Sequence, residues 1–265
     1  MVSLFVVILT FFASLVSALF GGGSGLLIVP GIFWLLTHIN PPEQHYLMQT
    51  TIATSFLLSI PIGLISSLKH YKYGNIDNNL IKKYLPFILL GVVIGLLTLL
   101  FIKTNFLKIY FSIMVFSISL WMYFKKPDNL ENIKKQKIWP KWLVHFISFL
   151  IGFISTTIGA SIFIVPFLIK MKVDIRKAIA TSTVIVFIYA VIASISLILI
   201  GLSLNDLPED NIGLINLPIF LVGLLPSIIG SLIGTRLANS LPKEKLKLIF
   251  VIMMLAVAII MAIPK

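Results

Sequence analysis

The chain has 265 residues, of which 58% are hydrophobic and only 11% are charged, and it contains no cysteine. Soluble domains carry about 25% charged residues, so this composition excludes a water-soluble fold and is typical of a membrane protein. The absence of cysteine excludes disulfides, thiolate metal sites and cysteine nucleophiles. The formal net charge of +12 does not indicate nucleic-acid binding, because the basic residues lie in short loops between apolar stretches, where they act as topology signals.

Apolar stretches long enough to cross a bilayer recur along the whole chain. A transmembrane helix needs about 20 apolar residues. The first 20 residues contain no Lys or Arg before their apolar run, so we interpret them as part of the mature protein rather than as a signal peptide. The uninterrupted stretches that we expect to be full transmembrane helices are residues 46–68, 84–102, 106–124, 178–202, 214–235 and 246–263.

Two further apolar stretches, 2–36 and 142–169, are each broken near the middle by small residues. The pieces after the breaks, 26–36 and 162–169, are too short to cross a bilayer. We therefore expect an all-α, polytopic membrane protein with about eight hydrophobic segments, in which these two stretches form broken or re-entrant helices. The residues at the breaks are Gly21, Gly22, Gly23, Ser24 and Gly25 in the first, and Gly159, Ala160 and Ser161 in the second.

The two halves of the chain repeat each other in sequence. Residues 23–30 (GSGLLIVP) match 159–166 (GASIFIVP), and residues 53–55 match 180–182, which both read ATS. These matches indicate an internal duplication. We expect a first transmembrane half at 1–124, a cytoplasmic linker at 125–141 and a second transmembrane half at 142–265.

Loop charges predict that the two halves have opposite orientations in the membrane. Corresponding loops of the two halves carry opposite charge. Residues 38–45 have no Lys or Arg, whereas their counterpart 170–177 has four. Residues 69–83 are basic, whereas their counterpart near 206–210 is acidic. Since cytoplasmic loops are rich in Lys and Arg, the linker and 170–177 should share the cytoplasmic face. Lys103 and Lys108 do not fit, because this topology places them outside. Inverted repeats with broken helices that meet near the midplane are typical of transporters.

The small residues at the two breaks are the first candidate site. Non-helical backbone at membrane depth survives only where protein or a water-filled cavity surrounds it. Glycines let backbone N–H groups approach a ligand closely, and Ser24 can cap the half-helix that follows. Two half-helix N-termini that point at the membrane centre would attract an anion. The alternative is that these small residues only let helices pack closely.

Hydroxyl and amide side chains form the second candidate site. Thr51, Thr54 and Ser55 fall on one helical face, from which they could hydrogen-bond an oxyanion. The alternative is that these hydroxyls bond to their own or neighbouring helix backbones. The candidate substrate-binding residues of this second set are Gln49, Thr51, Thr54 and Ser55, with Thr181 and Ser182 in the other half.

Several kinds of site are missing from the sequence. All nine acidic residues lie in the predicted loops, so no span carries the carboxylate that a cation pathway or a proton relay normally needs. The four histidines lack metal-ligand spacing, and no nucleotide-binding, nucleophile-elbow or zinc-protease motif is present. We therefore expect neither an enzyme nor a bound cofactor or metal.

The order of motifs in the first half resembles the TauE/SafE sulfite exporter family. The glycine run leads into LLIVP at 26–30, and is followed by ATS at 53–55, by Lys69 and His70, and by GNID at 74–77. The resemblance extends over nearly the whole chain. It implies a bacterial or archaeal permease of the cytoplasmic membrane that moves sulfite, thiosulfate, sulfoacetate or related anions, commonly outward. The second copy departs from the family pattern at Ile158, Ala160 and Ser161, where further glycines would be expected.

The sequence thus predicts a secondary transporter that moves a small sulfur-containing anion across the cytoplasmic membrane. An anion channel with the same lining and a membrane subunit without transport of its own remain alternatives. The partners that we expect are the anion and the lipid bilayer, without nucleic acid, and the sequence leaves a homo-oligomer open.

Overall fold

A computed structural model describes residues 2–39, 46–124, 139–204 and 207–240, together with positions 248, 252, 255–257 and 259. The linker residues 125–138 and most of the last predicted span, 246–263, lie outside the described residues. Seven of the described helices are long and apolar enough to cross a membrane. This confirms the prediction of a polytopic helical membrane protein.

The described part of the chain consists mainly of helices, with one small hairpin of two strands. Their bounds in chain order are α1 (Val2–Phe20), α2 (Ser24–Ile39), α3 (Leu47–Lys72), α4 (Asn78–Leu99), α5 (Thr104–Phe124), α7 (Lys141–Ile158), α8 (Ile164–Lys170), α9 (Ile175–Gly201), β1 (Asn211–Ile212), β2 (Ile215–Asn216) and α10 (Leu217–Ser240). The strands pair antiparallel, with Asn211 opposite Asn216.

Local capping explains where the helices differ from the predicted spans. α4 begins six residues before the predicted start at 84, because the Asp77 carboxylate accepts hydrogen bonds from the N–H groups of Asn79 and Leu80. Asp174 caps α9 in the same way through the N–H of Arg176. A side-chain oxygen at this position satisfies N–H groups that have no partner within the helix. α10 begins later than predicted because residues 211–216 form the β-hairpin.

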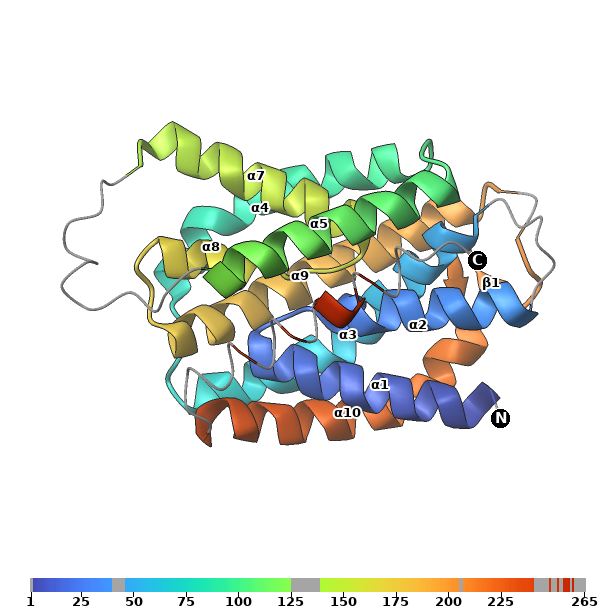
Figure 1. Cartoon of the computed structure of the whole chain (residues 1–265), viewed down its shortest axis with the longest axis horizontal. Helices are drawn as coiled ribbons and strands as arrows, with labels where there is room; N and C mark the ends of the chain where they lie inside the picture. The colour runs from blue at the N-terminus through green and yellow to red at the C-terminus, as the bar shows by residue number, and fades with distance from the viewer. Residues whose placement is uncertain are drawn as a thin grey trace.

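The chain forms two helical hairpins that enter the bundle from opposite ends (Figure 1). α1 begins at the right-hand end of the view, and α2 returns toward that end after a turn. α7 begins at the left-hand end, and α8 returns to it. The second limbs are short, with 16 residues in α2 and 7 in α8, so neither reaches across the roughly 30 Å hydrocarbon core. Each hairpin therefore brings a turn into the interior of the bundle.

The hairpins are held by close helix pairs, α1 against α10 and α4 against α7. Glycine permits this approach: a Cβ at Gly230 would lie 2.3 Å from the carbonyl oxygen of Phe11, and one at Gly91 would lie 2.0 Å from that of Phe149. Small residues at such crossings are typical of membrane helices. In each pair, the first helix of one half packs on a helix of the other half. An inverted duplication would produce this arrangement.

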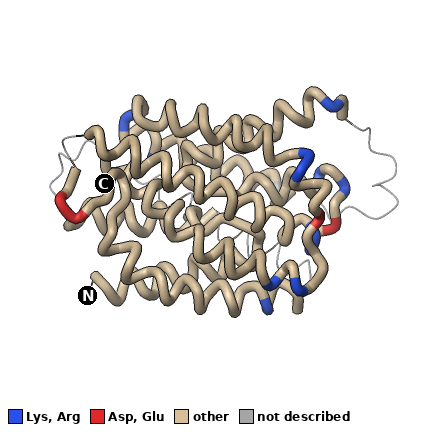
Figure 2. Tube along the Cα trace, turned by 180° about the vertical axis from the view of Figure 1, so that it is seen from behind, with Lys and Arg blue, Asp and Glu red and all other residues tan. Residues whose placement is uncertain are grey.

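Charged residues concentrate at the two ends of the bundle (Figure 2). Lys and Arg gather mainly at one end, which is the left-hand end of Figure 1 and carries the α3–α4 and α8–α9 connections. The opposite end carries Glu209 and Asp210, as well as Lys103 between α4 and α5. The helices between these ends present an almost uncharged surface, as the hydrocarbon core requires.

Candidate functional site

The turn between α1 and α2 consists of three glycines in left-handed conformations. The φ angles of Gly21, Gly22 and Gly23 are 73°, 132° and 103°. The N–H of Gly22 donates to the carbonyl of Ser17 at 2.9 Å, a Schellman closure of α1. Only glycine adopts three such φ values in a row without substantial strain, so the sequence Gly-Gly-Gly dictates this turn.

The turn between α7 and α8 closes in the same way with a single glycine. Gly159 has a φ of 68°, and the N–H of Ala160 donates to the carbonyl of Ser155 at 3.1 Å. The two turns therefore correspond through Gly21 and Gly159, whereas the sequence motifs pair Gly23 with Gly159. The structural pairing thus differs from the sequence pairing by two residues. The reason is that the Schellman glycine ends the first helix of each hairpin, whereas the sequence pairing is set by the IVP motif that follows the turn.

The two turns touch each other inside the bundle. The N–H of Gly23 donates to Ser161 Oγ at 3.1 Å, across 138 residues of sequence. A Cβ at Gly25 would lie only 1.7 Å from the carbonyl oxygen of Gly159, so backbone meets backbone here. Ser24 and Ser161 are 1% and 4% exposed. We call this contact of residues 21–25 with 159–161 the tip contact.

Each turn is hydrogen-bonded to one serine of the opposite half. Ser182 Oγ, on α9, donates to the carbonyl of Gly21. Ser55 Oγ, on α3, donates to the carbonyl of Gly159 at 3.4 Å and to its own helix at 2.8 Å. Ser55 and Ser182 are equivalent in the sequence repeat, and so are their acceptors in the structure. The hydroxyls thus bind backbone carbonyls at the ends of the first limbs.

The neighbouring threonines show a second pair of equivalent contacts. Thr54 Oγ1 accepts the N–H of Asn216 at 3.0 Å, and Thr181 Oγ1 accepts the N–H of Asp77 at 3.1 Å. Asn216 precedes α10 and Asp77 precedes α4, so each threonine anchors the start of a helix in the opposite half. The two threonines are fully buried.

Two predicted lining residues lie away from the tip contact. Gln49 Nε2 donates to the carbonyls of Leu99 and Ile102 at 3.3 and 2.8 Å, at the end of α4. Thr51 Oγ1 donates to the carbonyl of Leu47 on its own helix at 2.9 Å. These contacts give Gln49 a role in closing α4 and leave Thr51 in a backbone hydrogen bond of the kind common for threonine in membrane helices.

Ser24 makes a contact that the sequence did not predict. It is the first residue of α2, and its Oγ is 2.7 Å from Ser59 Oγ on α3. Ser59 in turn lies 2.7 Å from the carbonyl of Ser55. The Ser24 hydroxyl therefore links α2 to α3, where we had expected it to cap α2.

Tyr189 is a tip residue that sequence reasoning missed. Its hydroxyl lies beside Ser161, and its side chain is 1% exposed. Its ring meets Phe56 edge to face, with ring centroids 5.9 Å apart. Tyr189 lies seven residues after Ser182, two helical turns along the same face of α9. That spacing could have revealed it once Ser182 was taken as a site residue.

The electrostatics of the tip contact favour an anion. The first N–H groups of a helix have no acceptor within it, and the 16-residue α2 directs the positive end of its dipole into the bundle. α8 has only seven residues and begins at Ile164, so its dipole is weaker than we expected from the sequence. Within the described part of the chain, no group of three or more His, Asp or Glu side chains could hold a metal ion.

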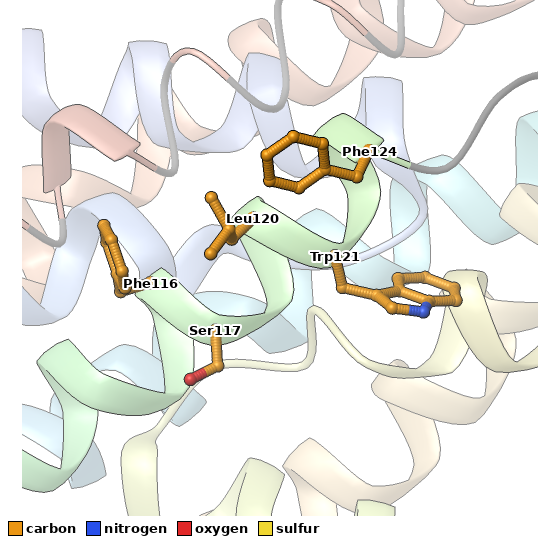
Figure 3. A pocket seen from close by; sticks show the side chains of 5 residues that line it. All are labelled: Phe116, Ser117, Leu120, Trp121 and Phe124. Atoms are coloured by element: carbon orange, nitrogen blue, oxygen red, sulfur yellow. The ribbon is translucent and has the colours of Figure 1, made fainter.

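A shallow hollow on α5 has a different character from the tip contact (Figure 3). Its lining comes from a single helix: Phe116, Ser117, Leu120, Trp121 and Phe124. Phe116, Leu120, Trp121 and Phe124 are all at least 40% exposed. Such a mostly apolar outer surface suits contact with hydrocarbon.

Comparison with known proteins adds an independent line of evidence. The sequence profile described as "Sulfite exporter TauE/SafE" matches residues 6–261. A probable membrane transporter protein of Haemophilus influenzae is 32% identical over 254 residues, covering 93% of each chain. No solved structure matches the chain significantly.

Two more distant relatives carry the same description. The probable membrane transporter protein MJ0441 of Methanocaldococcus jannaschii is 25% identical over 91% of this chain and 88% of its own length. The probable membrane transporter protein YunE of Bacillus subtilis is 27% identical over 74% of this chain and 78% of its own. All three descriptions are of transporters rather than enzymes.

Proposed function

The chain belongs to the TauE/SafE sulfite exporter family and is a multi-pass transporter of the cell membrane, and from this premise we propose that it is a secondary permease for a small sulfur-containing anion. The substrates that fit the proposal are sulfite, thiosulfate and organosulfonates, moved outward across the cytoplasmic membrane. The observation that carries the proposal is the tip contact, in which the N–H of Gly23 and the N-terminus of α2 meet Ser161 inside the bundle.

The tip contact offers donors that an oxyanion can use. Ser161 Oγ now accepts the N–H of Gly23, and an oxyanion bound between the two turns would replace it as the acceptor. The Ser161 hydroxyl would then be free to donate to the anion as well. Backbone N–H groups at a helix start and one hydroxyl form a compact set of donors for a group of three oxygens. Charged acceptors strengthen such bonds, since the site is removed from water.

Because the tip contact is buried, transport requires the two halves to move relative to each other. Tip residues such as Ser24 and Ser161 are almost inaccessible, so an anion reaches them only when the halves separate on one side. The hydrogen bonds from Ser55 to Gly159 and from Ser182 to Gly21 cross between halves and would break in turn. Because the hairpins enter from opposite ends, rocking one half against the other would open the site to each face alternately.

A flux screen in proteoliposomes tests the proposed function. The purified protein should take up sulfite in a saturable manner, and unlabelled sulfite on the opposite side should accelerate labelled uptake by counterflow. Thiosulfate, sulfate and a short organosulfonate define the range of substrates. Linear, non-saturating flux without counterflow would indicate an anion channel. The absence of flux for every anion would indicate a membrane subunit and would contradict the proposal.

The cysteine-free chain allows a direct test of the proposed orientation. A single cysteine at Lys172, between α8 and α9, should react with an impermeant thiol reagent only after cells are opened. A cysteine at Ser203, after α9, should react in intact cells. Because the natural chain has no cysteine, any label found on the purified protein comes from the introduced residue. The reverse pattern would contradict the assignment of the Lys- and Arg-rich end to the cytoplasm.

A further inference from the structure

A buried histidine lies near the Lys- and Arg-rich end of α3, well away from the tip contact. His70 is only 1% exposed, and neither Nδ1 nor Nε2 has a hydrogen-bond partner among the described residues. A buried imidazole without partners is unfavourable, because it loses its hydrogen bonds to water and gains none. Such groups in membrane proteins mark functional sites by default, and the tip contact does not use this one.

Other hydroxyls gather around His70. Ser66 precedes it by four residues and Ser67 by three, so both are its neighbours on the helix surface. Ser67 Oγ is also buried and has no partner in the part of the chain that the structure describes. Ser66 Oγ lies 3.3 Å from Thr235 Oγ1 on α10, which identifies α10 as the neighbouring helix. The imidazole and two serine hydroxyls thus supply donors at one place on α3.

Positive charge surrounds this end of α3. Lys69 Nζ donates to the carbonyl of Leu232 on α10 at 2.8 Å. The positive charges of Arg236 and Lys72 are close enough to interact electrostatically with Lys69. One turn beyond, Asn75 Nδ2 donates to Asn239 Oδ1, which joins the ends of the two helices. These cationic side chains, together with the donors on His70 and Ser67 that have no partner among the described residues, would attract an anion rather than a cation.

A line of hydroxyls connects His70 with the tip contact. Ser66, Ser59 and Ser55 lie four, eleven and fifteen residues before His70, spacings that keep all of them near one face of α3. Ser59 is hydrogen-bonded to Ser24 at the tip. Eleven residues of helix correspond to a rise of about 16 Å, so His70 is at a distance from the tips that one small anion cannot bridge.

We propose that His70, Ser66 and Ser67 form a second binding site for a small oxyanion, through which the anion passes between the Lys- and Arg-rich end and the tip contact. This inference rests on the proposed function in taking the permeating anion as its ligand. The neutral imidazole donates one N–H to the anion, while the serine hydroxyls supply further donors. Lys69 and Arg236 raise the local anion concentration.

The first test is binding of sodium sulfite, observed at His70 itself. The chain has four histidines, so replacing His38, His45 and His145 by Gln leaves His70 as the only imidazole. In this protein, labelled with ¹⁵N-histidine and purified without a histidine tag, sulfite should shift the imidazole resonances in a saturable way. The shift should persist in the Gly23→Val background, because the two sites are separate. No shift in a protein that transports sulfite would overturn the site and leave the proposed function intact.

The second test is side-specific transport. For sulfite presented at the Lys- and Arg-rich end, His70→Ala should raise KM by about tenfold, the effect of one lost hydrogen bond to a charged group. His70→Gln, which keeps a donor, should recover part of the loss. His145→Ala is the matched control, since His145 lies on α7 and stacks on Phe87 of α4 with ring centroids 4.0 Å apart.

The outcomes separate the two proposals. A native KM at both faces in His70→Ala would overturn the His70 site. An equal loss for Ala and Gln together with a lower thermal transition would assign His70 a structural role, which also overturns it. A saturable shift in a protein that carries no sulfite would contradict the proposed function and retain the site.

Discussion

The two hairpins that meet at the tip contact differ in how they make the same turn. The α1–α2 hairpin uses three successive glycines and a second limb of 16 residues, whereas the α7–α8 hairpin uses one glycine and a limb of 7 residues. Both close their first limb with a Schellman motif, at Gly21 and at Gly159. One glycine is therefore sufficient for the turn, and the additional glycines of the first hairpin require another explanation.

That explanation lies in what each turn presents to the other. The first turn presents backbone: the N–H of Gly23 and the start of α2. The second presents a side chain, Ser161 Oγ, which accepts that N–H. The two hairpins thus share the fold of the turn and differ in the groups that they present. We expect substitutions in the first hairpin to reduce transport more than the substitution of Ser161 in the second, and the following predictions test this order.

Gly25→Ala should have the largest effect. Its Cβ would lie 1.7 Å from the carbonyl oxygen of Gly159, and backbone cannot move aside as a side chain can. The tips would separate, so we expect sulfite flux to fall below the detection limit and the thermal transition to decrease. Gly31→Ala is the matched control on α2, because its Cβ meets only the flexible end of Leu9. Equal effects of the two substitutions would contradict a specific role for the tip contact.

Gly23→Val should abolish most transport while leaving a folded protein. Gly23 has a φ of 103°, which costs a side-chain-bearing residue roughly 1 to 3 kcal/mol, and the added atoms would block approach of the anion to its N–H. The measurement is flux from monodisperse protein with a retained thermal transition. Gly74→Val controls for strain, since Gly74 has a φ of 66° and open space around its Cβ. Native flux in Gly23→Val would reduce this glycine to a packing feature.

Ser161→Ala should have an intermediate effect. The substitution removes the acceptor of the Gly23 N–H, which costs about 1 to 3 kcal/mol for a buried donor left unpartnered. Sulfite KM should rise several-fold, because the anion loses one hydroxyl donor. Ser161→Thr, which retains the hydroxyl, should remain closer to the natural protein. If Ala and Thr were equivalent in KM, the second hairpin would not contribute to binding.

Gln49→Ala should have the smallest effect on transport. Its amide donates to the carbonyls of Leu99 and Ile102, so its loss should lower the thermal transition by a few degrees. Sulfite KM should stay unchanged, because Gln49 lies outside the tip contact. A selective rise in KM at native stability would place Gln49 in the anion path and would extend the site beyond the two hairpins.

Sequence patterns were sufficient for the membrane class and for the position of both turns. Hydropathy identifies a transmembrane helix from local composition, because about 20 successive apolar residues match the thickness of the hydrocarbon core. The prediction of broken first helices followed from the same reasoning, since the runs at 21–25 and 159–161 interrupt apolar stretches. The opposite loop charges led to the expectation of inverted halves, and the opposite directions of the two hairpins in Figure 1 agree with that expectation.

Tertiary structure alone decided which residues meet. The correspondence of Gly21 with Gly159 and the contact of Ser24 with Ser59 could not be derived from the sequence. Gln49, Thr51, Thr54 and Ser55 have the same polar character in the sequence, yet only Ser55 reaches a tip. The physical reason is that hydropathy and turn propensity are properties of neighbouring residues, whereas a hydrogen bond across 138 residues depends on how every intervening helix packs.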